Sequence, residues 1–274
     1  MNDPYQKPKD YWELRLARNF DLTGVGYGLL GRHYNEIMYA ARLRSLGRAF
    51  RAGGIEIRGR SVLDVGCGTG FYTELCAQHQ ALSYTGIDLT NVSVHRLQRQ
   101  YPAFRFIRGD IASEALPLRD RFDLVIVGDV LFHIVEDGPF RQAIKNIGSW
   151  LKPGGCLALS DVLSVATVQY ESHCKFRARV EYKYILAQNG MVVERVEPIF
   201  SLLQPPIRMP GTNLVWKLYS DVWRVGLMRF ARHGWFDRWA PVWLEWLDRS
   251  IFLPRADVRT PNSKWLLATK RNAG

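Results

Sequence analysis

The residues of this chain that could do chemistry begin with a glycine-rich segment, Val62-Leu-Asp-Val-Gly-Cys-Gly-Thr-Gly70. An apolar run passes directly into Gly66, Gly68 and Gly70, and a segment with helical spacing comes next. Glycines at such a turn let the backbone approach a nucleotide-like ligand closely, and the adjoining helix points its N–H groups at that ligand. The spacing is Gly-x-Gly-x-Gly, and Phe71 stands where the third glycine of a dinucleotide motif would be. The motif therefore indicates a nucleotide-like ligand other than NAD, with a purely structural turn as the alternative.

A carboxylate stands at a suitable distance from these glycines. Asp88 ends the second predicted strand, within Tyr84-Thr-Gly-Ile-Asp-Leu89, 22 residues after Gly66. A carboxylate at this place can accept hydrogen bonds from both hydroxyls of a ribose, as acidic residues do in dinucleotide sites. Asp also caps helices, so the signal is weak when taken alone. Together with the glycines, Asp88 predicts a ribose-binding position.

Alternating strands and helices would position these residues. Short β-rich runs predict five strands, at residues 61–66, 83–88, 104–108, 122–128 and 156–162. Apolar spacing predicts helices between them, at 71–79, 91–100 and 138–151, and Thr90 or Asn91 could cap the second. Strands that alternate with helices imply right-handed crossovers and a mainly parallel sheet. Ligands then belong at the carboxyl ends of the strands.

The rest of the chain predicts three further elements and a large insertion. A helix is predicted over 176–189, a strand over 191–200 and a last strand over 264–270. More than sixty residues separate these two strands, and they contain helix-like stretches at roughly 212–231 and 236–252. We expect this insertion, together with the N-terminal segment, to form a substrate cap.

Five motifs succeed one another between about residues 58 and 163. They are the glycine segment 62–70, Asp88, Gly109-Asp110-Ile111, the segment from Phe122 to Ile134, and Leu151-Lys-Pro-Gly-Gly155. In this order they resemble the class I S-adenosylmethionine-dependent methyltransferases, specifically the small-molecule branch often labelled type eleven or twelve. The resemblance implies S-adenosyl-L-methionine as cofactor and S-adenosyl-L-homocysteine as product, with no metal expected.

The resemblance also implies the architecture. We expect a Rossmann-like α/β fold with a doubly wound, mostly parallel seven-stranded sheet. Residues 1–58 would form an N-terminal helical lid and 59–200 the cofactor-binding core. Residues 201–260 would form a helical, Trp-rich cap inserted between the last two strands, and 261–274 the last core strand and tail.

The cofactor contacts that the resemblance implies fall on motif residues. They are Asp64 and Gly66 by the methionyl amino group, Gly68 against the adenosine with Gly70 in the same turn, Asp88 on the ribose, Leu89 against the adenine ring, Asp110 on the adenine exocyclic amine and Ile111 stacking beside it. Asp110 has the alternative role of a turn residue after the third strand. The segment Leu151 to Gly155 is interpreted as a structural helix-to-strand turn.

Two N-terminal segments, Asp10-Tyr-Trp-Glu13 and Gly31-Arg-His-Tyr-Asn35, resemble the lid that covers the cofactor in such enzymes. The candidates for closing over the methionyl end are Tyr11, Tyr27, Tyr34 and Arg42. The alternative is that aromatic residues on a helix simply pack on the core, and both interpretations stay open.

Two residues after the fourth predicted strand are candidates for catalysis. Methyl transfer from a sulfonium needs an in-line nucleophile, so proximity and exclusion of water supply much of the acceleration, and only an alcohol or phenol acceptor needs a base. His133 lies where the transferred methyl should be, and an imidazole suits the role of base. Its alternative is a histidine hydrogen-bonded below the cofactor. Asp129 is the second candidate base, or else it only shapes the loop backbone.

The residues directly after the fourth strand narrow the choice of acceptor. Enzymes that methylate bases or glutamine usually show an Asp/Asn-Pro-Pro-aromatic tetrad there, whereas this chain has Gly128-Asp-Val-Leu131. We expect O-methylation of a hydroxyl on a small metabolite, sugar or glycan. N- or C-methylation of a small metabolite and a non-catalytic, cofactor-binding interaction protein are the alternatives.

The predicted insertion is rich in tryptophan and arginine. Its tryptophans are Trp216, Trp223, Trp235, Trp239, Trp243 and Trp246, interleaved with Arg224, Arg229 and Arg232. The last four tryptophans would share one face of a continuous helix, although Pro241 favours a break or a new helix start. Three interpretations compete: packing on the sheet, an aromatic acceptor pocket, and an amphipathic surface resting on a membrane.

Composition bounds the partners. The net charge of +11 favours anionic partners such as acidic glycans or phospholipids, with a solvated basic surface as the alternative. An anionic or lipid-linked acceptor is compatible with this positive charge. We do not expect nucleic acid as a partner, because the sequence shows no RNA-binding appendage. The four cysteines lack the pairing of a metal site, and no apolar run reaches membrane-spanning length. The polar N-terminus predicts no signal peptide. We therefore expect a soluble cytoplasmic protein, whose oligomeric state stays open.

Overall fold

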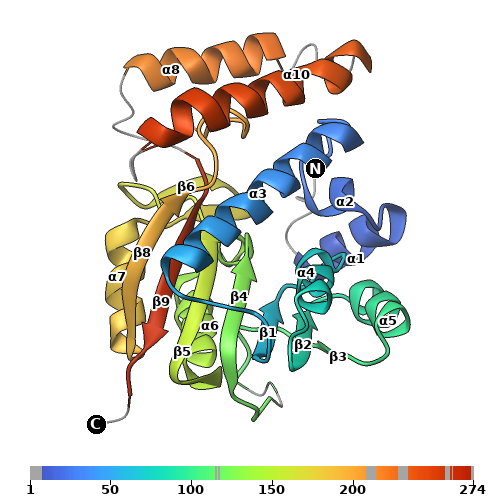
Figure 1. The fold of residues 1–274 in the computed structure, drawn as a ribbon, viewed down its shortest axis with the longest axis vertical. Helices are drawn as coiled ribbons and strands as arrows, with labels where there is room; N and C mark the ends of the chain where they lie inside the picture. The colour runs from blue at the N-terminus through green and yellow to red at the C-terminus, as the bar shows by residue number, and fades with distance from the viewer. Residues whose placement is uncertain are drawn as a thin grey trace.

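A seven-stranded sheet forms the centre of the molecule in the computed structural model of the chain (Figure 1), which describes residues 8–114, 116, 118–207, 214–227, 234–256, 260 and 262–272. The strands are β1 (Ser61–Val65), β2 (Ser83–Asp88), β3 (Arg105–Arg108), β4 (Phe122–Gly128), β5 (Leu151–Asp161), β8 (Met191–Pro198) and β9 (Lys264–Lys270). Their order is β3-β2-β1-β4-β5-β9-β8. β1 to β5 are parallel, and β9 runs antiparallel to both of its neighbours. The prediction of a mostly parallel seven-stranded sheet is confirmed.

Helices cover both faces of the sheet, as a doubly wound fold requires. The described helices along the core are α4 (Phe71–Gln78), α5 (Asn91–Gln100), α6 (Asp137–Trp150) and α7 (Arg179–Gln188). Alternate residues of each strand point to opposite faces, so Val62 joins the cluster under α4 and α5 while Leu63 joins the cluster under α6 and α7. The side chain of Thr90 accepts a hydrogen bond from the Ser93 backbone and caps α5, as predicted.

The N-terminal segment is helical. Its helices are α1 (Pro8–Arg18), α2 (Leu22–Val25) and α3 (Arg32–Ala52). The long helix α3 packs on the sheet through buried residues such as Met38 and Leu46, and it lies on the same face as α4. The short helices α1 and α2 lie next to α5 and α3, at the carboxyl ends of the strands (Figure 1).

The segment between β8 and β9 forms a helical layer on top of α3 (Figure 1). Its described elements are α8 (Leu214–Asp221), the π-helical turn η2 (Val222–Leu227), α10 (Gly234–Leu247), the π-helical turn η3 (Asp248–Phe252) and the 3-10 turn η4 (Leu253–Arg255). The break expected at Pro241 is wrong, because α10 continues through it. Pro241 is buried, and Phe236, Ala240 and Leu244 pack α10 against the core from both sides of it. Arg229 and Arg232 lie outside the described residues.

Three features between β4 and α7 differ from the predictions. A two-stranded hairpin, β6 (Val168–Glu171) and β7 (Cys174–Phe176), was not predicted, and α7 begins only at Arg179. The predicted turn from Leu151 to Gly155 belongs to the start of β5, which pairs irregularly with β4 at that point.

None of the described helices is long and apolar enough to cross a membrane.

Candidate functional site

The three glycines form a tight turn at the carboxyl end of β1. Gly66, Gly68 and Gly70 have φ angles of 77°, 51° and 88°, in the left-handed region that favours glycine. A Cβ on Gly66 would lie 2.4 Å from Cγ2 of Val130, and one on Gly70 would lie 2.5 Å from Cδ2 of Leu97. These two positions therefore require glycine for packing as well as for conformation. At Gly68 the side chain nearest to an added Cβ belongs to the lid, because that Cβ would lie 3.2 Å from Cγ1 of Val25 in α2.

Asp88 ties this turn to the end of β2. Its Oδ2 accepts from the Gly68 backbone N–H at 2.9 Å. Its Oδ1 accepts from the backbone N–H and the hydroxyl of Thr90, at 2.9 and 2.7 Å. The residue is buried, and burial raises the pKa of its carboxyl. A carboxylate can accept about four hydrogen bonds, so Asp88 keeps acceptor capacity for a ligand beside Gly68.

Asp64 lies inside the sheet behind the turn. It is fully buried in β1, and its Oδ2 accepts from the hydroxyl of Tyr84 at 2.7 Å. Its Oδ1 has no hydrogen-bond partner among the described residues. Burial raises the pKa of this carboxyl to about 7. Asp64 therefore offers a buried acceptor without a donor at the place where the methionyl amino group is predicted.

The three residues predicted around the adenine ring have different environments. Leu89 is partly exposed beside Asp88, whereas Ile111 is buried in the core. Asp110 is exposed, and its Oδ1 accepts from the Ala112 backbone N–H at 2.8 Å. Asp110 thus forms the turn that was its alternative role. Its contact with adenine stays a prediction.

The lid is attached beside the predicted ribose position by a residue that was not predicted. Glu13 of α1 accepts from the backbone N–H groups of Asn91 and Val92, at 2.7 and 2.9 Å, and so binds the N-terminus of α5. Arg15 then joins α1 to α2, because it donates to the Gly26 carbonyl at 2.7 Å. A carboxylate at a helix N-terminus is stabilised by the unpaired N–H groups there. These contacts hold α1 and α2 over the carboxyl ends of β1 and β2.

The predicted lid tyrosines are engaged with protein groups. The hydroxyl of Tyr11 accepts from Arg15 at 2.6 Å. The hydroxyl of Tyr27 accepts from Gln204 at 3.1 Å, and burial raises its pKa to about 12. Tyr34 is fully buried and donates to the Leu203 carbonyl at 2.8 Å. The environment of Tyr34 is that of a packing residue between α3 and the helical layer, and none of these contacts tests the predicted closure over the methionyl end.

Arg42 and Asp129 form an ion pair at the end of β4, in which Arg42 is buried and Asp129 is partly exposed. The guanidinium Nη1 of Arg42 lies 2.5 Å from Oδ2 of Asp129, and Arg42 is only 5% exposed. Oδ1 of Asp129 accepts from the hydroxyl of Ser160 at 2.8 Å, and its backbone has a φ of 58°. Both carboxylate oxygens are therefore engaged. This arrangement favours the loop-shaping role of Asp129 over that of a base.

His133 lies in the 3-10 turn η1 (Leu131–His133), half-buried under the lid. Its ring centroid is 5.3 Å from that of Trp12 in α1, with the rings edge to face. Its Nδ1 lies 3.3 Å from the His173 carbonyl and 3.7 Å from Sγ of Cys174; a proton on Nδ1, donated to the carbonyl, would leave Nε2 as an acceptor. Burial lowers the pKa of this imidazole to about 4. His133 is therefore neutral at neutral pH.

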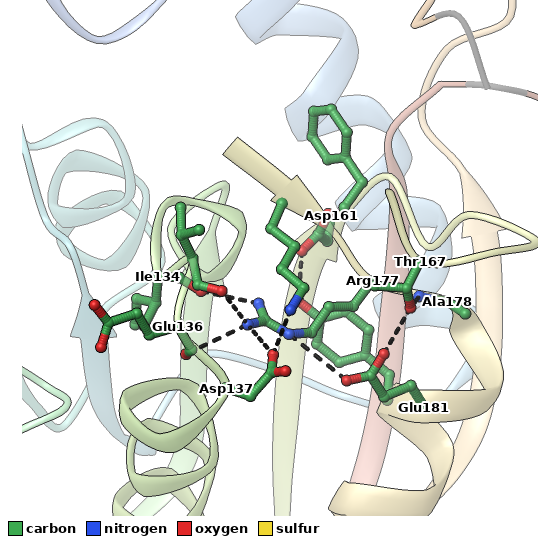
Figure 2. Close-up of polar contacts among 12 residues, drawn as sticks. Ile134, Glu136, Asp137, Asp161, Thr167, Arg177, Ala178 and Glu181 are labelled. Carbon is green, nitrogen blue, oxygen red and sulfur yellow. Dashed lines mark hydrogen bonds and ion pairs between the residues drawn. The ribbon is translucent and has the colours of Figure 1, made fainter. Parts of the chain in front are cut away.

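Arg177, another residue that was not predicted, supports the chain after His133 (Figure 2). It is fully buried, and its guanidinium donates to the carbonyls of Ile134 and Val135 at 2.9 and 3.0 Å. It also lies 2.9 Å from Oδ1 of Asp137, and Figure 2 shows the group pointing into this loop. The contacts fix the backbone on the C-terminal side of η1.

The β6–β7 hairpin brings three potential metal donors together. Donor atoms of Glu171, His173 and Cys174 lie within 4.8 Å of one another. Nε2 of His173 is already 3.4 Å from a carboxylate oxygen of Glu171, which an ordinary ion pair explains. Burial raises the pKa of the Cys174 thiol to about 12, which disfavours the thiolate that a metal needs. That the protein needs no metal ion stays a prediction.

Sequence comparisons match the central part of the chain to known proteins. A family model described as a methyltransferase domain matches residues 62–155. The ubiquinone biosynthesis O-methyltransferase of Coxiella burnetii is 31% identical over 112 residues, which are 39% of this chain and 46% of that protein. The malonyl-[acyl-carrier protein] O-methyltransferase of Halalkalibacterium halodurans is 33% identical over 144 residues, 50% of this chain and 48% of that protein. The chain thus spans about half the length of the curated relatives it matches.

Solved structures extend the similarity to the whole fold. Magnesium protoporphyrin IX methyltransferase from Synechocystis, with bound S-adenosylhomocysteine, has a TM-score of 0.56 at 16% identity and covers 96% of this chain and 98% of its own. A structure described as the [4+2]-cyclase SpnF has a TM-score of 0.50 at 22% identity, over 79% of this chain and 76% of its own. At these identities the similarity shows a common fold, and proteins with different named activities share it.

Proposed function

We propose that the chain is a class I S-adenosylmethionine-dependent methyltransferase, which the methyltransferase-domain match over residues 62–155 supports, and that it transfers the cofactor's methyl group to a hydroxyl of a small metabolite, sugar or glycan. The observation that carries the proposal is the joined pair of Gly68 and Asp88 at the carboxyl ends of β1 and β2. In this pair, Gly68 offers backbone that a ligand can approach closely, and the neighbouring Asp88 carboxylate can accept further hydrogen bonds. Both are needed where a nucleoside binds.

The residues around this pair fit S-adenosyl-L-methionine. Asp64 keeps a buried carboxylate oxygen without a partner, which suits the methionyl ammonium. Asp88 suits the ribose hydroxyls, and the partly exposed Leu89 suits the adenine ring. When bound, the cofactor supplies an electrophilic methyl group on a sulfonium. The protein then has to bind it, exclude water and present the acceptor in line.

His133 is the residue that we propose to take the proton of the acceptor hydroxyl. Its imidazole is neutral at neutral pH, and the tautomer with the proton on Nδ1, donated to the His173 carbonyl, has Nε2 as an acceptor. A pKa of about 4 makes a weak base, so removal of the proton would accompany methyl transfer rather than precede it. Trp12 packs edge to face against the ring, and Arg177 positions the adjoining loop.

Oxygen is the preferred acceptor atom on two grounds. His133 offers a base, which oxygen acceptors need and tertiary amines do not. The printed names of the Coxiella and Halalkalibacterium relatives are those of O-methyltransferases. N- or C-methylation of a small metabolite remains the alternative.

All four cysteines are free and buried, which suits a reducing compartment, and we propose that the protein acts in the cytoplasm.

The test is release of S-adenosyl-L-homocysteine on mixing protein and cofactor with panels of hydroxylated sugars, phenols and amines. We expect release with at least one hydroxylated acceptor, and none with amines alone. Because no metal is expected, EDTA should leave the rate unchanged. Release with amines only would replace oxygen by nitrogen as the acceptor. Tight cofactor binding without release from any panel would favour a non-catalytic, cofactor-binding protein.

A further inference from the structure

The helix α10 has two apolar faces. One face packs on the core through Phe236 and Leu244. The other carries Trp239, Trp243 and Trp246, which are 54%, 61% and 47% exposed. Residues spaced by three and four positions lie on one side of a helix, so these tryptophans form a continuous row. Large aromatic side chains are rarely left in water in such a row without a partner.

The neighbouring segment of α8 and η2 repeats the arrangement. Its inner face holds Trp223, which is buried and donates to the Leu202 carbonyl at 3.1 Å. Its outer face carries Leu214, Leu218 and Val225, which are 69%, 58% and 66% exposed. Ten of the seventeen exposed large apolar side chains among the described residues fall within residues 214–252. We call this outer surface of α8, η2, α10 and η3 the aromatic layer.

The exposed charges of the aromatic layer, among its described side chains, are basic. Among the described residues of 214–256, every charged side chain that is exposed is basic: Lys217, Arg238, Arg249 and Arg255. The acidic residues described there are buried or partly buried. Asp248 is buried and accepts from the backbone of Ser201 at 2.9 Å, and Glu245 pairs with Arg44.

We propose that the aromatic layer docks on the surface of an anionic phospholipid bilayer. Tryptophan prefers the boundary between lipid and water, where its ring is buried and its N–H stays hydrated. Basic side chains beside it are attracted to anionic headgroups. A helix with such a face lies in the plane of the interface, in keeping with described helices that are too short or too polar to cross it.

Charge favours the bilayer over a second copy of the chain. A symmetric pair joined through the aromatic layer would bring the same cations, Arg238 and Arg249 among them, toward each other. The net charge of +11 adds to that repulsion, and the same charge attracts an anionic surface.

Docking would also set the orientation of the site. The inner face of α10 packs on α3, and α3 supplies the Arg42 that pairs with Asp129 at the end of β4. The carboxyl ends of the strands therefore lie one helix below the docking surface (Figure 1). The proposal does not depend on methyl transfer, since the surface would bind lipid whatever reaction the core performs.

The experiment is co-sedimentation of the full chain with vesicles of phosphatidylcholine, alone or mixed with phosphatidylglycerol. We expect binding to the mixed vesicles, weaker binding to the neutral ones, and loss of that difference at high salt. The triple variant Trp239→Ser, Trp243→Ser, Trp246→Ser should lower partition onto mixed vesicles by at least about tenfold. The double variant Arg238→Ser, Arg249→Ser should mainly lower the preference for anionic lipid.

A matched control removes equally exposed apolar groups elsewhere. Leu82, Val180 and Tyr184 are 74%, 70% and 61% exposed and lie outside the aromatic layer. Their triple substitution by Ser should leave vesicle binding unchanged. Thermal unfolding and circular dichroism check that each variant folds. A wild-type chain that does not sediment with mixed vesicles, or a folded tryptophan variant that binds as well as wild type, overturns the proposal. A wild-type dimer that the tryptophan variant dissociates, without vesicle binding, would assign the surface to a second copy instead.

Discussion

Gly68→Ala is the substitution that best separates a ligand-binding glycine from a structural one. Gly68 has a φ of 51°, and an added Cβ would lie 3.2 Å from Cγ1 of Val25, with no other side chain nearby. An alanine held in this conformation costs about 1–2 kcal/mol. Gly54 is the matched control, because its φ is 63° and an added Cβ would meet no atom within 4 Å.

The two variants should therefore lose similar stability but differ in cofactor binding. We expect each to lower the free energy of unfolding by about 1–2 kcal/mol, measured by denaturant titration. Only Gly68→Ala should weaken S-adenosyl-L-methionine, by about tenfold or more in calorimetric titration, which corresponds to about 1.4 kcal/mol. The methyl group must displace either Val25 of the lid or the ligand that lies against the turn. Wild-type affinity in a folded Gly68→Ala protein would refute the placement of the adenosine against this turn.

Three further predictions concern titratable residues. Asp88→Ala removes the acceptor of the Gly68 and Thr90 hydrogen bonds, so it should weaken S-adenosyl-L-methionine by at least about tenfold and also lower the melting temperature; unchanged calorimetric affinity in a folded variant would contradict this. His133→Gln should lower turnover by about a hundredfold or more while leaving cofactor affinity unchanged, and the wild-type kcat/KM should fall only as the pH approaches about 4; an unchanged rate would reduce His133 to a packing residue. Burial raises the pKa of Asp161 from 3.8 to about 7, so the folded state holds its proton more tightly and stability is lost as the pH rises between these values. Asp161→Asn should remove that part of the pH dependence, up to about 4 kcal/mol in denaturant titrations at low and neutral pH, and an unaltered slope would contradict the shift.

Local patterns were enough to predict the core of the fold. The strands at 83–88, 122–128 and 264–270 have the predicted bounds, because each run contains several of the aromatic, β-branched or aliphatic residues that fit a half-buried strand. The β6–β7 hairpin was missed because its strands are only four and three residues long, so the alternation in Val168-Gln-Tyr-Glu171 is too short to indicate a strand. The continuous helix through Pro241 was missed because local sequence favours a break at proline, whereas packing of α10 on α3 outweighs that preference.

The site was predictable only in part. The glycine turn and Asp88 could be predicted to lie together, because both follow strand ends and parallel strands bring their carboxyl ends together. The parts of the site that depend on long-range contacts could not be predicted. Glu13, Ser160 and Arg177 act on partners 78, 31 and 43 residues away in the chain, and no local pattern reports such pairs. A shared face for Trp239, Trp243 and Trp246 was expected only if the helix were continuous, and its direction was left open among packing on the sheet, an acceptor pocket and a membrane surface. Both faces of α10 are apolar, so periodicity alone cannot tell which one is buried.

Calorimetric titration of the purified chain with S-adenosyl-L-methionine, S-adenosyl-L-homocysteine and NAD tests the central claim most directly. Any cofactor that copurifies has to be removed first. The glycine turn and Asp88 predict binding of both sulfur ligands, with dissociation constants on the order of micromolar, and no heat from NAD. Binding of NAD, or no heat from either sulfur ligand with a folded protein, would contradict the assignment of this site.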